Sequence, residues 1–293
     1  MSPSHLKLFL VALFASCTVA AKQPEVELNY RIQPGRDLTT ETVVDAVTTI
    51  RVLEDRGIVA KSSGRISSRP VSIRLTNKQT IRYITGQVQP DQTFPVEMHY
   101  IDKTSHVIGL DGQRQLLPER MPFKGLRVVA AVELGGKLRE DSVEVMGGDP
   151  AIAEPLRKII AAVLTQAAAV QPIALSVDQS VPQVMALQVP LPGLPPLDIK
   201  MRISNQLLSV DDGIARVQQI YSMDFINPAG AMKMTAEGSG GGTMLYEVST
   251  QTLLSTETGT LMKMTIETAE GVIEIQANSK ESQTTRPTNA AAR

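Results

Sequence analysis

The sequence predicts a mainly β protein of the α+β kind. We expect a curved antiparallel sheet or half-open barrel with one central amphipathic helix at about residues 150–170. Three observations lead to this prediction. Runs with strand-like alternation fill both halves of the chain, one helical pattern separates them, and β-branched residues are abundant while aromatic residues make up 3%. A helix between two sheet-forming regions packs its apolar side on a sheet, so we expect it on the concave face.

The first 21 residues have the pattern of a signal peptide. A short basic segment containing Lys7 precedes the apolar run Leu8–Ala15, and the small residues before Lys22 suit cleavage. No later segment approaches the roughly 20 apolar residues that a membrane-spanning helix needs. We therefore expect an exported protein of the periplasm or cell envelope, with no transmembrane span after processing.

Cys17 is the only cysteine and lies within this leader. Residues 14–17 resemble a lipobox, so Cys17 is a candidate for lipidation, which would anchor the protein to a membrane. The alternative is that Cys17 is removed with the signal peptide. In both cases we expect no disulfide in the mature protein.

Residues 22–148 are predicted to form a first β-meander. Its first strand, Glu25–Ile32, alternates polar and apolar residues, and the β-branched segment Thr39–Leu53 follows before a turn at residues 55–57. Prolines between the later runs mark loops. These later runs are 71–75, 81–84, 96–100, 126–133 and 143–146.

Residues 149–171 are predicted to form the central helix. Apolar residues recur at spacings of three and four, so they fall on one helix face. Pro150 suits a first helical turn, whereas Pro155 falls late enough to disturb it, so we expect regular helix from about Leu156. Pro172 ends the pattern.

Residues 172–280 are predicted to form a second meander, in one domain with the first (22–280). The polar residues 281–293 lack periodicity, so we expect a disordered tail. Gly238–Gly242 lacks the Lys-Ser/Thr and the helix that follow a phosphate-binding loop, and we interpret it as a flexible hairpin turn between two strands. Leu197–Ile203 repeats the alternation of Val26–Ile32, which suggests a duplicated unit.

A repeated Met-Lys-Met-Thr tetrapeptide is the sharpest local feature of the second half. The copies at 232–235 and 262–265 place their methionines on one strand face and their lysine on the other, and we expect them to flank one intervening strand. Core packing against the helix, a deformable surface for an apolar ligand and a Cu(I) thioether site are the three interpretations. The ligand interpretation predicts an apolar lining of Met232, Met234, Met262, Met264, Leu156, Ile160 and Val163.

Composition argues against several classes of function. The formal net charge is −1 and tryptophan is absent, so we expect no nucleic-acid binding. Only His99 and His106 follow the leader, too few for a zinc site, and no Gly-x-Ser-x-Gly or His-Glu-x-x-His motif occurs. A carboxylate pair of the glycosidase kind stays open as a third hypothesis. We predict no enzymatic activity, no metal and no cofactor.

The order of elements resembles a group of bacterial envelope proteins of uncharacterised function, in which a mid-chain helix separates two meanders. Gly240–Gly242, Tyr246-Glu247 and Leu253–Ser255 are similar to that group's pattern, whereas Val177–Ser180 lacks the glycine and tryptophan that the group carries after the helix. The layout also resembles lipoprotein carriers of the LolA/LolB type. That resemblance implies a half-open barrel with a helical lid over an acyl-chain cavity.

These observations lead to two hypotheses about function. The first is a non-catalytic exported envelope protein that binds or carries a lipid, a lipoprotein or another amphiphile between sheet and helix. The alternative is a structural or assembly partner of other envelope proteins, with a fully packed core and no ligand.

Overall fold

The computed structural model describes most of the chain. The predicted signal peptide at 1–21, with Cys17, lies outside the described residues, as do Met232 and residues 289–293. The described residues are 25–29, 31–61, 68–109, 112–116, 125–147, 150–168, 170–189, 197–227 and 233–288.

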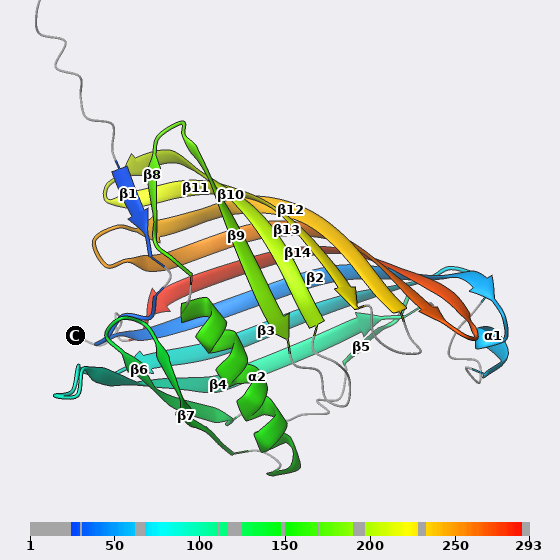
Figure 1. Cartoon of the computed structure of the whole chain (residues 1–293), viewed down its shortest axis with the longest axis horizontal. Helices are drawn as coiled ribbons and strands as arrows, with labels where there is room; N and C mark the ends of the chain where they lie inside the picture. The colour runs from blue at the N-terminus through cyan, green and yellow to red at the C-terminus, as the bar shows by residue number, and fades with distance from the viewer. Residues whose placement is uncertain are drawn as a thin grey trace, which may run out of the picture.

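Strands dominate this part of the chain, as Figure 1 shows, and the prediction of a mainly β protein is confirmed. The elements are β1 (Glu25–Leu28), β2 (Asp37–Asp55), α1 (Ile58–Lys61), β3 (Val71–Thr85), β4 (Thr93–Ile108), β5 (Arg114–Leu116), β6 (Arg127–Glu133), β7 (Leu138–Met146), α2 (Pro150–Ala168), β8 (Ile173–Ser176), β9 (Ser180–Val189), β10 (Leu197–Asp211), β11 (Ile214–Asn227), β12 (Lys233–Glu247), β13 (Thr252–Thr268) and β14 (Gly271–Pro287).

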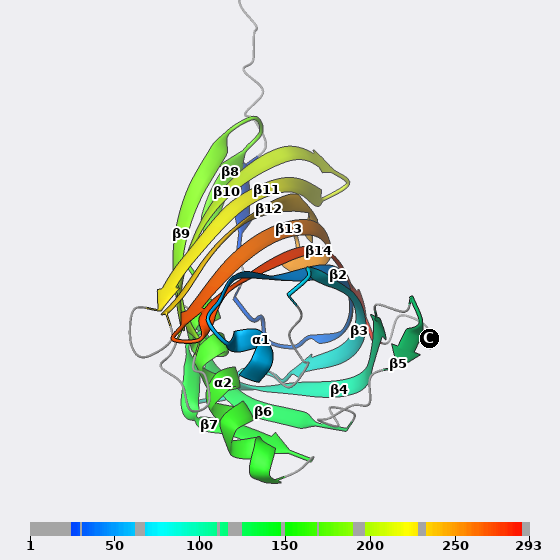
Figure 2. The same ribbon diagram turned by 90° about the vertical axis from the view of Figure 1, so that its right-hand side faces the viewer.

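One large antiparallel sheet contains strands of both predicted meanders. Its order is β7-β6-β4-β3-β2-β14-β13-β12-β11-β10-β9, and β5 pairs with β4 beside this path to give 12 strands. The two halves join where β14 pairs with β2. The sheet curls but does not close into a barrel (Figure 2), because β7 and β9 remain as separate edges. The predicted curved, open antiparallel sheet is therefore confirmed.

The predicted central helix is confirmed as α2, which lies at the gap between the two sheet edges and contacts both β7 and β9 (Figure 2). It begins at Pro150 rather than near Leu156, because Pro155 removes only one backbone hydrogen bond and does not end the helix. No helix in the described ranges is long and apolar enough to cross a membrane.

Two layers cover parts of one face of the large sheet, which we call the inner face. Ile160 and Ala161 of α2 pack on the buried side chains of β4, β6 and β7. The second layer is the small sheet of β1 and β8, which packs Leu28 and Leu175 on β10, β11 and β12. Pairing registers place both sets of contacts on the same face of the large sheet.

The prediction of a hairpin turn at Gly238–Gly242 is wrong. These residues lie in the middle of β12, which continues through them and pairs with β11 and β13 along its whole length. A glycine run between two alternating segments is typical of a loop, but it also occurs where neighbouring side chains or backbone need the space above a strand.

The prediction of a disordered tail is wrong for residues 281–287. They form the end of β14 and pair with residues 38–44 of β2. This segment of β14 lacks an apolar alternation because most of its own side chains are polar on both faces of the strand. Threonine pairs take the place of apolar contacts, for example Thr40 Oγ1 with Thr285 Oγ1 at 3.1 Å.

The proposed duplication is not matched by the fold. Val26 and Leu28 belong to the short β1 in the small sheet, whereas Leu197–Ile203 starts the long β10 in the large one. The shared alternation reflects one buried and one exposed face in each strand rather than equivalent positions.

Candidate functional site

The inner face carries a row of methionines that crosses the sheet at right angles to its strands. Side chains opposite one another in adjacent strands point to the same face and lie within contact distance. Through the pairing of β9 to β14, β2 and β3, we define the methionine row as Met185, Met201, Met223, Gly238, Met262, Ala277, Thr48 and Ile73.

Two further apolar rows lie beside the methionine row, toward the ends of β11 and β13. Together the three rows form what we call the inner apolar zone. The second row is Ile199, Phe225, Ala236, Met264, Ile275, Ile50 and Val71, and the third is Met234, Ile266, Ile273 and Val52.

Most side chains of the inner apolar zone are only half-buried. Met185, Met201, Met223 and Met262 all belong to this intermediate class, whereas Phe225 at 6% exposure is an exception. Apolar side chains that remain partly accessible over several adjacent strands are typical of a surface that binds something.

Of the predicted methionines, the described ones, Met234, Met262 and Met264, lie on the inner face, and Met232 lies outside the described residues. The lysines of the two repeats, Lys233 and Lys263, lie on the outer face as the alternation predicted. Met234 is 9% exposed and packs in a small cluster against which Met264 also packs, while Met262 belongs to the methionine row. The two tetrapeptides occupy directly paired strands, so the expectation that they flank a third strand is wrong. β12 and the expected intervening strand are one continuous strand.

The predicted helix residues lie in a different cluster. Ile160 is 8% exposed and Leu156 is half-buried, and both pack against β4, β6 and β7 rather than against the methionines. The side chain of Val163 lies outside the described part of the structure. The structure therefore places the two predicted halves of the lining on one face but in separate clusters.

Sequence reasoning missed Met185, Met201 and Met223. Each stands alone on its own strand, and only the registers of four strand pairings, from β9 through to β13, align them with Met262. The available indication was that each is the apolar member of an alternating run, which identifies its face but not its neighbours.

Two of the glycines of β12, Gly238 and Gly240, are explained by side chains that cross this strand. A Cβ at Gly238 would lie 3.0 Å from Met223 Cγ, and one at Gly240 would lie 2.6 Å from Tyr221 Cζ. Tyr221 reaches over β12 to bond the Thr260 hydroxyl on β13. The glycine run therefore gives Met223 and Tyr221 room to lie flat on the inner face.

A band of uncharged polar side chains, which we call the polar belt, borders the methionine row on the side away from the second row. Gln219 Nε2 donates to Asn205 Oδ1 at 2.7 Å, and Asn205 is 0% exposed. Beyond the belt lies the buried cluster under β1 and β8. The belt consists of Asn205, Gln219, Tyr221, Thr258 and Thr260.

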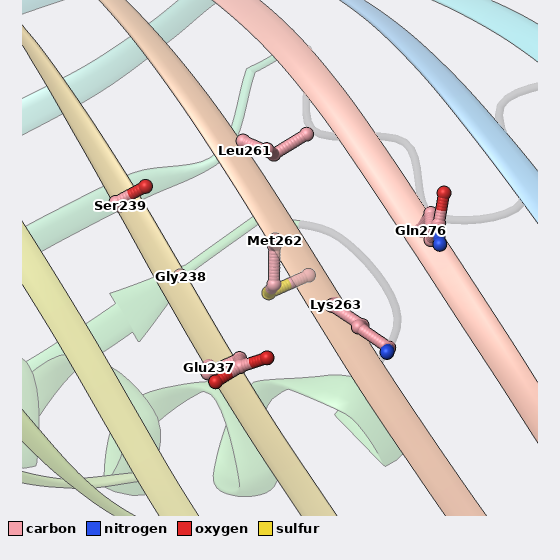
Figure 3. Close-up of a pocket in the computed structure, with 7 residues that line it drawn as sticks. All are labelled: Glu237, Gly238, Ser239, Leu261, Met262, Lys263 and Gln276. Atoms are coloured by element: carbon pink, nitrogen blue, oxygen red, sulfur yellow. The ribbon is translucent and has the colours of Figure 1, made fainter.

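The outer face opposite the methionine row is charged. Glu274, 6% exposed, lies 3.1 Å from Lys263 Nζ and accepts a hydrogen bond from Gln276 Nε2 at 2.9 Å. A depression of about 330 Å³ lies on these strands, as Figure 3 shows. It is lined by Glu237, Gly238, Ser239, Leu261, Met262, Lys263 and Gln276.

The histidine considered for metal binding takes part in a surface ion-pair group instead. His99 Nε2 lies 2.9 Å from Glu97 Oε2, and Arg127 Nη2 lies 2.7 Å from the same oxygen. Hydrogen bonds from His99 and Arg127 hold the pKa of Glu97 below its ordinary value, although burial opposes this shift. Among the described residues, no group of three or more His, Cys, Asp or Glu side chains is arranged to hold a metal ion.

Fold and site together define an open antiparallel sheet with an apolar, half-buried inner zone and a charged outer face. No protein-family model matches the sequence, and no curated protein matches it. Among solved structures, the chain is similar to lipovitellin, in a structure concerned with lipid–protein interactions, with a TM-score of 0.43 and 10% identity. The match covers 89% of this chain and 26% of the lipovitellin chain, and this distant likeness between large sheets assigns no family.

Proposed function

We propose that the protein binds the apolar part of an amphiphile, such as a lipid acyl chain, on the inner apolar zone. The observation that carries the proposal is the methionine row, in which Met185, Met201, Met223 and Met262 line up across β9 to β13 and stay half-buried. Unbranched thioether side chains adapt to irregular apolar ligands, and so they suit a site for flexible chains.

The contrast between the two faces of β13 supports this proposal. Leu261, on the outer face, has polar Ser239 and Asn278 opposite it, whereas Met262 has Gly238 and Ala277. Burying apolar surface contributes about 25 cal/mol per Å². An apolar chain that lies along the methionine row therefore buries side chains that are neighbours across several strands, whereas at Leu261 the neighbours across the strands are polar.

We further propose that this is a non-catalytic activity of an exported envelope protein. The leader pattern at residues 1–21 supports export, and Cys17 leaves two forms of processing. The intact mass of the protein from membrane and soluble fractions distinguishes them, because a lipidated Cys17 adds the mass of its acyl groups.

The first experiment is gentle purification of the protein followed by solvent extraction and mass spectrometry. We expect a co-purified lipid in stoichiometric amount. If no lipid is recovered and a pyrene-labelled acyl methyl ester does not bind, the proposal is wrong. A stoichiometric protein captured by crosslinking in that case would favour the alternative of an assembly partner.

A matched pair of variants locates the site. Met262→Lys places a charge on the inner apolar zone, and we expect it to weaken probe binding about tenfold or more because the ammonium group loses water against an apolar ligand. Leu261→Lys, at the neighbouring position that is 58% exposed on the outer face, is the control and should bind normally. Equal effects of both variants would contradict the inner-face assignment.

A further inference from the structure

Asn205 is the inner-face residue that packing alone does not explain. Its side chain is 0% exposed, and it lies between Ile203 and Leu207 on the same face of β10. Its Nδ2 has no hydrogen-bond partner among the described residues. A buried amide donor left unpaired costs about 1–3 kcal/mol, so this position favours a ligand that brings an acceptor.

Gln219 orients this amide. Gln219 Nε2 donates to Asn205 Oδ1 at 2.7 Å, so the oxygen of the Asn205 amide is paired and its nitrogen is the group left over. Val181 and Gln219, which flank Asn205 across the sheet, are only half-buried. Because Asn205 is 0% exposed, a ligand acceptor contacts Nδ2 when the side chain of Val181 or Gln219 moves aside.

The surroundings of this pair select an uncharged acceptor. The residues next to it along and across the strands carry no charge: Val181, Ile203, Leu207, Val217, Tyr221 and Gly242. An anionic head group would lose its hydration here without a neighbouring cation, which is costly, whereas an ester carbonyl needs only one donor.

We infer that Asn205, oriented by Gln219, donates a hydrogen bond from Nδ2 to the ester carbonyl of a neutral acyl lipid whose chain lies on the inner apolar zone. The methionine row is separated from this pair by one row of side chains, that of Ile203 and Tyr221. Strand geometry places the two rows about 14 Å apart, a distance that one acyl ester spans. This inference rests on the proposed function and adds the class of head group.

The test compares three pyrene-labelled probes of equal chain length, a methyl ester, a free acid and a hydrocarbon, in fluorescence titrations of the full protein at neutral pH. We expect the ester to bind about fivefold more tightly than the hydrocarbon, as one buried hydrogen bond supplies, and the acid to bind more weakly than the ester. Asn205→Leu and Gln219→Leu should abolish the preference, so that the ester and the hydrocarbon bind each variant with similar affinity.

Gln218→Leu is the matched control, because Gln218 precedes Gln219 on β11 but lies on the outer face and is exposed. If Asn205→Leu does not fold, Gln219→Leu provides the test, because Gln219 is only half-buried and its substitution disturbs the fold less. Equal binding of ester and hydrocarbon, tighter binding of the acid, or a preference retained in both variants would overturn the inference. In those cases the proposed function still stands, whereas failure of all three probes to bind removes both.

Discussion

The inner face has two regions with similar side chains but different cover. Under the β1–β8 layer, Leu207 and Val217 are 0% exposed and Met244 is 2% exposed. Further along the same face of the sheet, on β10, β11 and β13, Met201, Met223 and Met262 remain half-buried. The β1–β8 layer thus covers one apolar region, whereas the other is only partly covered. The two regions have similar side chains, so the presence of a covering layer distinguishes the core from the candidate site.

The sharpest way to test this difference is the same substitution in both regions. Met244→Ala should lower the free energy of unfolding by about 3 kcal/mol, because it leaves a cavity in a covered cluster. Met262→Ala should cost about 1 kcal/mol, because its side chain buries less surface and its surroundings relax. Denaturant unfolding monitored by circular dichroism measures both. Equal losses would show that the two regions are packed alike.

The glycines of β12 offer the next largest effect. Gly240→Ala should destabilise the fold by about 2 kcal/mol, because its Cβ would meet the Tyr221 ring and the carbonyl oxygen of Gly259. Gly135→Ala is the control, since nothing lies within 4 Å of a Cβ at that position. The melting temperatures of the two variants give the comparison. A neutral Gly240→Ala would contradict the close approach of Tyr221 to this position.

These glycines also show which parts of the fold the sequence predicts. Local periodicity was sufficient for the strand alternation and for α2, because a helix face such as Leu156–Ile160 depends on neighbours within one turn. A glycine run between two strands has the same local pattern whether it is a loop or a crossing point for Tyr221. Only the contact across strands distinguishes the two.

The candidate site was less predictable for the same reason. Met262 is recognised from a local repeat, but its alignment with Met185, Met201 and Met223 depends on the registers of four successive strand pairings, which side-chain alternation within one strand does not fix. The end of β14 is not predicted as a strand, because its sequence has no apolar alternation. Pairing with β2 nevertheless satisfies the hydrogen-bonding groups of its backbone.

The cluster between α2 and strands β4, β6 and β7, against which Tyr83 packs, should also respond to alkaline pH. Burial, with a smaller contribution from Tyr100, raises the pKa of Tyr83 to about 12, above its ordinary value of 10.0. The folded state therefore holds this proton more tightly than the unfolded state, so stability is unaffected below about pH 10 and falls between about pH 10 and 12. Tyr83→Phe should remove up to about 2 kcal/mol of this alkaline loss. Unfolding curves at pH 8 and 11 measure it, and identical pH dependence in both proteins would contradict the burial of Tyr83.

The smallest effect is expected on the outer face. There, side-chain ion pairs lie across neighbouring strands, and no apolar layer of the described residues covers them at Asp37 and Arg82. Asp37 accepts hydrogen bonds from Arg82 Nε at 2.8 Å and Nη2 at 2.7 Å, and these bonds lower the pKa of Asp37 although burial opposes them. The folded pKa lies below the unfolded one, so the contribution is present above about pH 4 and is lost as pH falls through the folded pKa. Because both side chains are partly exposed, Asp37→Asn should cost less than about 1 kcal/mol at neutral pH.

A double-mutant cycle with Arg82→Gln, measured at pH 7 and in 1 M salt, isolates the interaction between Asp37 and Arg82. A coupling as large as the loss from Met244→Ala would mean that the outer face stabilises the sheet as strongly as the covered core does.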